Sequence, residues 1–169
     1  AATYGVDPAR VAAMGFSAGG HVCADLATRY ATPCYEPVDA ADTQSARPLV
    51  AAPIYPVVTM SAPLAHAGSR EKLLGANPSA ALERAHSPHL NVQANTPPCF
   101  LLHAADDPGV PIENSLLLHA ALRAQRVPAE LHVFEKGGHG FGLRLAAGKP
   151  VEVWPDLFVA WARTHGWLG

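Results

Sequence analysis

The chain has 169 residues, of which 49% are hydrophobic and 15% charged, a balance typical of a protein with a buried core. Its 12 basic and 14 acidic residues give a formal net charge of −2, and no basic cluster is present, which argues against a nucleic-acid partner. No apolar run reaches about 18 residues, so we expect no membrane-spanning segment. The length favours a single domain over residues 1–169.

The first residues, AATYGVDPAR, contain no initiator Met, no basic segment and no apolar signal-like segment. We interpret the chain as the interior of a longer protein, and the sequence indicates no cellular compartment. Three cysteines, Cys23, Cys34 and Cys99, match no metal-ligand spacing and are interpreted as buried or incidental thiols.

Apolar runs alternate with helical patterns along the chain, as expected of parallel βαβ units. Residues 10–16 (RVAAMGF) predict a buried strand that ends at a glycine-rich turn. Residues 19–30 then predict a helix with Val22, Leu26 and Tyr30 on one stripe.

The middle of the chain is richer in proline. Residues 49–55 (LVAAPIY) predict a second buried strand, and the long segment 56–96 is expected to hold short helices at 70–74 and 79–84. Residues 99–103 (CFLLH) predict a third strand, entered through two prolines.

The last third of the chain predicts two helices and one strand. The helix at 113–125 has an apolar face made of Leu117, Ala120, Ala121 and Ala124. Residues 130–134 (ELHVF) predict the fourth strand. The final helix places four apolar residues at i, i+3, i+4 and i+7: Trp154, Leu157, Phe158 and Trp161. This helix can end at Gly166. The order predicts an α/β fold, a three-layer α/β/α arrangement with a mainly parallel sheet of about four strands.

The motif with the clearest chemistry is Gly15-Phe16-Ser17-Ala18-Gly19, a G-x-S-x-G between a predicted strand and a predicted helix. In that context the sharp turn lifts the serine hydroxyl clear of the sheet. Both glycines are expected to leave room where a Cβ would clash. The N–H groups that begin the following helix point toward developing negative charge. Ser17 is therefore the predicted nucleophile, and the alternative is an ordinary strand-to-helix turn.

A serine nucleophile needs a base that removes its proton and an acid that orients the base. Asp106 and Asp107 follow the third predicted strand, and His139 lies between Gly138 and Gly140 after the fourth. The carboxyl ends of parallel strands form the edge at which open α/β sheets bind ligands. Adjacent residues at a strand's end point to different sides, so only one of the two carboxylates can face the imidazole.

Nine histidines compete for the role of base. Five lie in less suitable places, inside predicted strands or helices or near the end of the chain: His103, His132, His21, His119 and His165. His86 and His89 suggest a metal pair, but Pro88 breaks the helical spacing and no carboxylate or cysteine joins them. We therefore predict His139 as the base, and we predict no metal site.

Three segments, YGVDPARVAAMGFSAGGH, DDPGVPIENS and FEKGGHGFGL, resemble bacterial esterases of the α/β-hydrolase superfamily, closest to the acetyl-xylan-esterase-like and feruloyl-esterase-like enzymes. Prolyl-oligopeptidase-type peptidases are more distant. The resemblance covers nearly all of the chain. It implies Ser17 as nucleophile, His139 as base, an aspartate after the third strand as orienter, and the backbone N–H of Ala18 as half of the oxyanion hole.

The same resemblance bears on which aspartate is the acid. The family's usual spelling places the acid three residues before Val-Pro, which Asp107 fits, and Pro108 biases Asp107 toward an extended backbone. A competing Asp-Asp spelling, in which the first acid is catalytic, fits Asp106. Asp107 is the predicted orienter, with Asp106 as the alternative.

The resemblance implies a carboxylic ester hydrolase that works through an acyl-enzyme, favours small acetyl-type esters and uses no cofactor. One alternative is a prolyl-oligopeptidase-type serine peptidase, and another is an inactive or weakly active fragment or interaction module. The family's second oxyanion donor comes from an HGGG-like loop before the nucleophile, and neither that loop nor a strand before residue 10 is seen here. We therefore expect a truncated α/β-hydrolase fold, with residues 1–4 as the tail of a preceding helix and a bare sheet edge that favours a homodimer.

Overall fold

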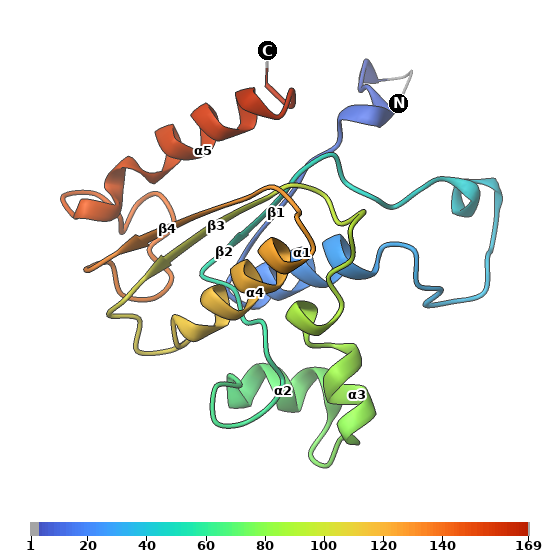
Figure 1. Cartoon of the computed structure of the whole chain (residues 1–169), viewed down its shortest axis with the longest axis horizontal. Coiled ribbons are helices and arrows are strands. Elements are labelled where there is room, and N and C mark those ends of the chain that lie inside the picture. Colours follow the sequence, from blue (N-terminus) through green and yellow to red (C-terminus); the bar gives the residue numbers. More distant parts are fainter. Residues whose placement is uncertain (1–3, 169) are drawn as a thin grey trace.

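The computed structural model describes residues 4–168, so the helix tail expected at residues 1–4 falls mostly outside the described residues. Within them the chain forms a four-stranded parallel sheet in the order β1-β2-β3-β4 (Figure 1). The strands are β1 (Ala13–Phe16), β2 (Ala51–Ile54), β3 (Cys99–Ala104) and β4 (Ala129–Phe134). Each predicted strand is therefore present, with ends that differ from the prediction by at most three residues.

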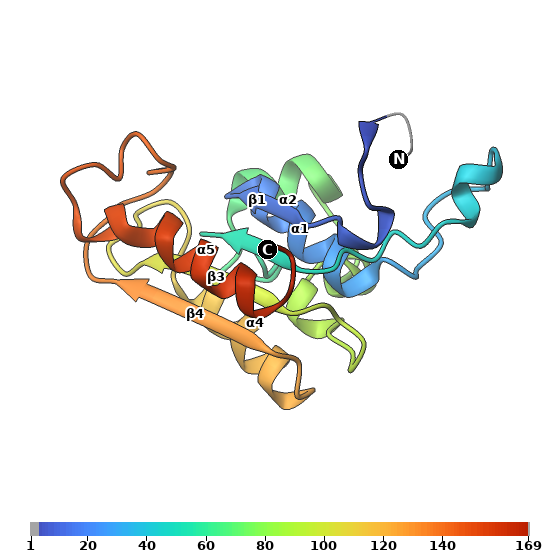
Figure 2. The ribbon, with the colours of Figure 1, turned by 90° about the horizontal axis from the view of Figure 1, so that it is seen from above.

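Helices cover both faces of the sheet. Helices α1 (Ala18–Arg29) and α4 (Glu113–Ala124) contact one face, and α5 (Trp154–Thr164) lies on the other (Figures 1 and 2). The prediction of a three-layer α/β/α fold is confirmed. None of the helices among residues 4–168 combines the length and the apolar character needed to cross a lipid bilayer.

The long connection between β2 and β3 holds α2 (Ala67–Leu74) and α3 (Ala80–Ala85), which lie beyond the α1 and α4 layer (Figure 1). The short helices predicted there are confirmed, although α2 begins three residues earlier than expected. Four 3₁₀ turns complete the described chain: η2 (Pro8–Arg10), η3 (Ala40–Thr43), η4 (Pro88–Leu90) and η5 (Pro150–Val153).

The first strand differs from its prediction in length and burial. The predicted segment 10–16 begins inside η2, which Asp7 caps and in which Pro8 supplies a fixed φ. Met14 and Phe16 are each 39% exposed, so the prediction of a buried strand is wrong. The reason is that β1 is an edge strand of the described sheet and pairs only with β2. The homodimer expected from such an edge stays a prediction.

Helix α1 buries a different stripe from the predicted one. Val22 is 67% exposed and Leu26 is 36% exposed. The residues against the sheet are mostly small, among them Gly20 and Ala24. A Cβ at Gly20 would lie 2.9 Å from the Cα of Pro56, so the helix packs too closely for large side chains. The hydrophobic pattern alone therefore predicted the wrong buried face of α1.

Helix α4 is also rotated relative to its prediction. Ala120 and Ala124 are exposed, and the buried apolar residues are Leu118 and Leu122. The buried face also carries the polar residues Asn114 and Ser115, whose side chains are hydrogen-bonded inside the protein. Buried polar groups weaken the apolar periodicity on which the prediction depended.

Helix α5 matches its prediction, and its inner face completes one of two main cores. Trp154, Phe158 and Trp161 pack with Phe100 and Leu102 of β3 between the sheet and α5. The second core lies between the sheet and the α1 and α4 layer. Helices therefore cover both faces of the sheet. The loops that carry the predicted site residues meet at the carboxyl ends of the strands.

Candidate active site

Ser17 occupies a tight turn between β1 and α1. Its φ of 56° and ψ of −117° are unusual for a residue with a Cβ. Surrounding hydrogen bonds hold this backbone in place: Ser17 N–H donates to the carbonyl of Ile54 at 3.0 Å, and Ser17 C=O accepts from His21 N–H at 3.1 Å and Val57 N–H at 3.2 Å. A strained residue at such a turn is the geometry of a nucleophile elbow.

The two glycines of the motif have different roles. A Cβ at Gly15 would lie 1.9 Å from the carbonyl oxygen of Gly19, so Gly15 is required for the turn. A Cβ at Gly19 would meet nothing within 4 Å, so the expectation that Gly19 also relieves a clash is wrong. Gly20 is the second tight position, because it faces the backbone of Pro56.

His139 reaches Ser17 from the loop that follows β4. Its Nε2 lies 2.8 Å from Ser17 Oγ, although the two residues are 122 positions apart. The ring of Tyr55 packs edge-on against the imidazole at a centroid distance of 5.3 Å, and the Tyr55 hydroxyl accepts the N–H of Gly142 at 3.1 Å. The structure thus brings the predicted nucleophile and base into hydrogen-bond contact.

Asp107 lies on the other side of the imidazole. Its Oδ2 is 2.7 Å from His139 Nδ1, and its Oδ1 accepts the N–H groups of Gly109 at 2.8 Å and Val110 at 2.9 Å. The carboxylate is completely buried. A carboxylate only accepts hydrogen bonds, so Nδ1 carries the proton and Nε2 is free to accept from the Ser17 hydroxyl.

Asp106, the alternative acid, contacts backbone instead of the imidazole. Its Oδ1 accepts the N–H groups of Gly137 at 2.9 Å and Gly138 at 2.8 Å. These hydrogen bonds hold the pKa of Asp106 below its usual value, and the bond from Gly138 has the largest effect. Between the two adjacent carboxylates, the geometry therefore places Asp107 beside His139.

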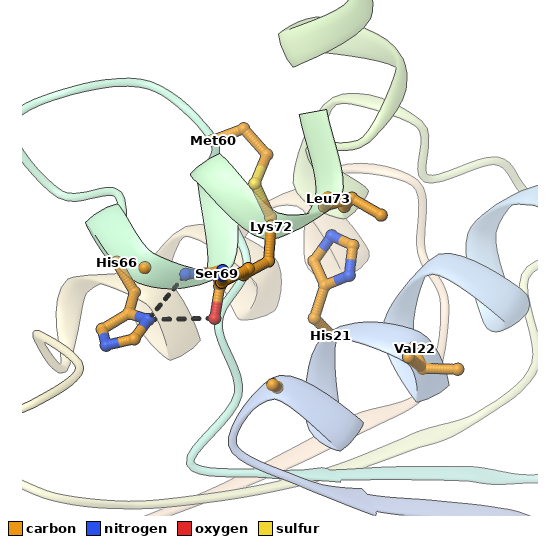
Figure 3. Close-up of a pocket in the computed structure, with 9 residues that line it drawn as sticks. His21, Val22, Met60, His66, Ser69, Lys72 and Leu73 are labelled. Carbon is orange, nitrogen blue, oxygen red and sulfur yellow. Dashed lines mark hydrogen bonds between the residues drawn. The ribbon is translucent and has the colours of Figure 1, made fainter. Parts of the chain in front are cut away.

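The backbone N–H of Ala18 lies at the start of α1, where the first N–H groups of a helix lack intrahelical acceptors. A cavity of about 520 Å³, shown in Figure 3, has Ala18 among its lining residues. His21 of α1 points into it toward α2, and Met60 and Leu73 line it from the other side. Sequence reasoning did not identify this cavity, because its walls come from the start of α1 and from the segment after β2, which are far apart in the sequence.

Among the remaining histidines, His103 is fully buried within β3, as expected of a packed side chain. Its Nε2 donates to the carbonyl of Val110 at 3.0 Å, and its Nδ1 lies 2.7 Å from Ser115 Oγ. Burial lowers the pKa of His103, which keeps the ring neutral. Its Nε2 also lies 3.4 Å from Asp107 Oδ2, a contact that the sequence did not reveal.

His21 and His132 also have partners inside the protein. His21 Nε2 donates to the carbonyl of His86 at 2.8 Å, and burial lowers the pKa of His21. This contact ties the start of α1 to the end of α3. His132 Nε2 lies 2.6 Å from Glu130 Oε1.

The suspected metal pair does not form a ligand cluster. His86 Nδ1 accepts from Arg29 at 3.1 Å, and the buried Nδ1 of His89 has no hydrogen-bond partner. Over residues 4–168, no group of three or more His, Cys, Asp or Glu side chains has an arrangement suited to a metal ion.

The cysteines are free thiols. Cys23 and Cys99 are buried and Cys34 is exposed, in agreement with their interpretation as buried or incidental thiols. Burial raises the pKa of Cys23 to about 11 and that of Cys99 further still, so both thiols are protonated and unreactive at neutral pH.

Comparison with known proteins supports the same architecture. The family BD-FAE matches residues 1–122. The chain is 40% identical over 140 residues to the endo-1,4-beta-xylanase B of Butyrivibrio fibrisolvens, covering 83% of this chain and 22% of that protein. It is 31% identical over 146 residues to the acetylxylan esterase of Xylanibacter ruminicola, covering 84% of this chain and 28% of that protein.

A solved structure gives a close match. The acetyl ester-xyloside bifunctional hydrolase of Caldicellulosiruptor lactoaceticus superimposes with a TM-score of 0.90 at 40% identity, covering 97% of this chain and 60% of that one. The chain thus spans less than a third of the two curated relatives named above and about three fifths of this structure. The chain belongs to the BD-FAE family, and its fold is that of the α/β-hydrolase esterases.

Proposed function

We propose that this chain carries the catalytic residues of a carboxylic ester hydrolase with Ser17 as nucleophile, His139 as general base and Asp107 as the acid that orients the base. The observation that carries the proposal is the continuous hydrogen-bonded series from Asp107 Oδ2 to His139 Nδ1 and from His139 Nε2 to Ser17 Oγ. The Ser17 turn at the start of α1 supports it.

In the proposed reaction, Ser17 Oγ attacks the ester carbonyl carbon while His139 Nε2 takes the hydroxyl proton. The carbonyl oxygen becomes an oxyanion, which the N–H of Ala18 stabilises. The C–O bond to the alcohol then breaks, and His139 returns the proton to the departing alkoxide. Water attacks the acyl-enzyme with the same base, which releases the carboxylic acid and restores Ser17. Asp107 stays ionised and stabilises the imidazolium in both steps.

We further propose that the substrates are small-molecule esters with small acyl groups of the acetyl type. Two similar proteins, an acetylxylan esterase and an acetyl ester-xyloside bifunctional hydrolase, support this choice. The cavity beside Ala18 offers room next to the reacting carbonyl for one side of the ester. Longer acyl chains serve as the competing class in the test.

The nucleophile is tested with a fluorophosphonate probe, which phosphonylates an activated serine. We expect a single adduct on Ser17 by peptide mapping, and no adduct in Ser17→Ala. An adduct on another residue would contradict the assignment. Absence of any adduct, together with absence of ester turnover, would favour the non-catalytic alternative.

The substrate class is tested with nitrophenyl esters. We expect nitrophenyl acetate to have the higher kcat/KM when compared with nitrophenyl octanoate, and proline-nitroanilide peptides to stay intact. Preferential hydrolysis of the octanoate would overturn the acetyl assignment while leaving the triad in place. Preferential peptide cleavage would move the protein to the peptidase alternative.

A further inference from the structure

The loop that carries His139 has little structure of its own. It follows β4 and contains four glycines, of which Gly138, Gly140 and Gly142 have positive φ values between 48° and 70°. Glycine adds conformational freedom that other residues lack. His139 therefore depends on contacts from outside the loop to keep its Nε2 at 2.8 Å from Ser17 Oγ.

We propose that Asp106 is a positioning residue that clamps this loop and so holds His139 in its reactive pose; the proposal rests on the proposed hydrolase function. One carboxylate oxygen, Oδ1 of Asp106, accepts two consecutive backbone N–H groups, those of Gly137 and Gly138. Gly138 directly precedes His139. Asp106 thus fixes the backbone one peptide away from the catalytic imidazole.

Neighbouring contacts explain why the clamp sits at this point. A Cβ at Gly137 would lie 2.8 Å from the Cβ of Ala104, so this glycine packs directly on the end of β3, within reach of Asp106. Lys149 Nζ donates to the carbonyl of Gly137 at 3.1 Å, which holds the same peptide from its other side. The N–H groups that bond to Asp106 keep its pKa low, so the carboxylate is ionised at neutral pH.

The two adjacent aspartates therefore both position His139, through different contacts. Asp107 binds the imidazole ring, and Asp106 binds the backbone that carries the ring. If the clamp is lost, the Ser17–His139 geometry loosens while the substrate cavity beside Ala18 is unchanged. Because a displacement of about 1 Å can cost about a hundredfold in rate, the loss is expected in kcat and not in KM.

A matched pair of variants separates the clamp from the charge. Asp106→Asn and Asp106→Ala both remove the negative charge, but only asparagine keeps an oxygen that can accept the two N–H groups. We expect Asp106→Ala to lower kcat for nitrophenyl acetate by about 10- to 100-fold with KM within about twofold. Asp106→Asn should restore kcat to within about threefold of the parent.

Two further measurements distinguish positioning from a general structural effect. In a His139→Ala background, Asp106→Ala should cause no additional loss of residual activity, because the clamp acts only through His139. Amide hydrogen exchange at Gly137 and Gly138 should be slow in the parent and in Asp106→Asn, and fast in Asp106→Ala.

Equal losses of kcat in the asparagine and alanine variants would overturn the proposal, as would an additive loss in the His139→Ala background. Unchanged exchange at both glycine amides in Asp106→Ala would overturn it independently of any activity. If the parent neither reacts with the fluorophosphonate nor hydrolyses esters, the proposed function fails. The exchange measurement still decides whether the clamp exists.

Discussion

Replacing Asp107 with asparagine tests the orientation of His139, the proposed general base. Asp107 is buried, and its Oδ1 is held by the N–H groups of Gly109 and Val110. An asparagine would keep its oxygen on those two donors and would therefore turn its NH₂ group toward His139. Two donors cannot share one hydrogen bond, so the imidazole would move its proton from Nδ1 to Nε2.

The protonated Nε2 can no longer accept the hydroxyl proton of Ser17. A wrong tautomer at this position in a serine triad costs about 10⁴-fold in kcat, and each factor of ten corresponds to about 1.4 kcal/mol, so the loss is about 5–6 kcal/mol of transition-state stabilisation. The assay is the turnover of nitrophenyl acetate, with circular dichroism and thermal unfolding to show that the variant is folded.

Asp106→Asn is the matched control, because it makes the same change of charge and shape one residue away. If Asp107→Asn kept more than about a tenth of the parental kcat, Asp107 would not be the group that orients His139. A large loss of kcat in Asp106→Asn, together with a near-parental kcat in Asp107→Asn, would reverse the assignment of the two carboxylates.

Three further predictions concern the turn, the core and the pH dependence of stability. Gly15→Ala should abolish soluble protein that reacts with the fluorophosphonate, because the new Cβ would collide with the carbonyl oxygen of Gly19. Gly19→Ala should still be labelled, because a Cβ there meets nothing within 4 Å. Equal expression and labelling of the two variants would contradict this prediction. Asn114→Leu should lower the free energy of unfolding, measured in urea, by about 2–4 kcal/mol, because it leaves the buried N–H groups of Val58 and Thr59 without an acceptor. A loss below about 0.5 kcal/mol would show that Asn114 does not stabilise the fold through these two hydrogen bonds. Burial lowers the pKa of His103 in the folded state, so the unfolded chain binds more protons once the pH falls below the ordinary value of 6.5. The thermal midpoint should therefore fall as the pH is lowered from about 7.5 to about 5.5, and His103→Gln should flatten this slope; an unchanged slope would argue against that histidine as the source.

The order of strands and helices could be predicted because each element carries a local pattern. The aromatic residues Trp154, Phe158 and Trp161 repeat at helical spacing, and the structure buries that face of α5. The motif around Ser17 likewise predicted a strand, a turn and a helix, and all three are present. These features depend on neighbours within a few residues, so the sequence contains them directly.

The inner faces of α1 and α4 could not be predicted in the same way. Their buried sides combine small residues, such as Gly20, with polar residues, such as Asn114, and both weaken a hydrophobic pattern. Whether a glycine relieves a close approach depends on which segment lies opposite, which for Gly20 is Pro56 after β2. That information comes from packing between distant parts of the chain.

Taken alone, the sequence determined the α/β class, the chain order of the elements and the three loops that supply the candidate site. Only the tertiary structure decided which of two adjacent aspartates meets the imidazole. Asp106 and Asp107 are chemically identical, and they differ only in what lies on each side of the end of β3: loop amides for Asp106, and His139 for Asp107. A hydrogen bond depends on the positions of both partners, and His139 lies 32 residues from Asp107, so the local spelling that favoured Asp107 still left Asp106 open as the alternative.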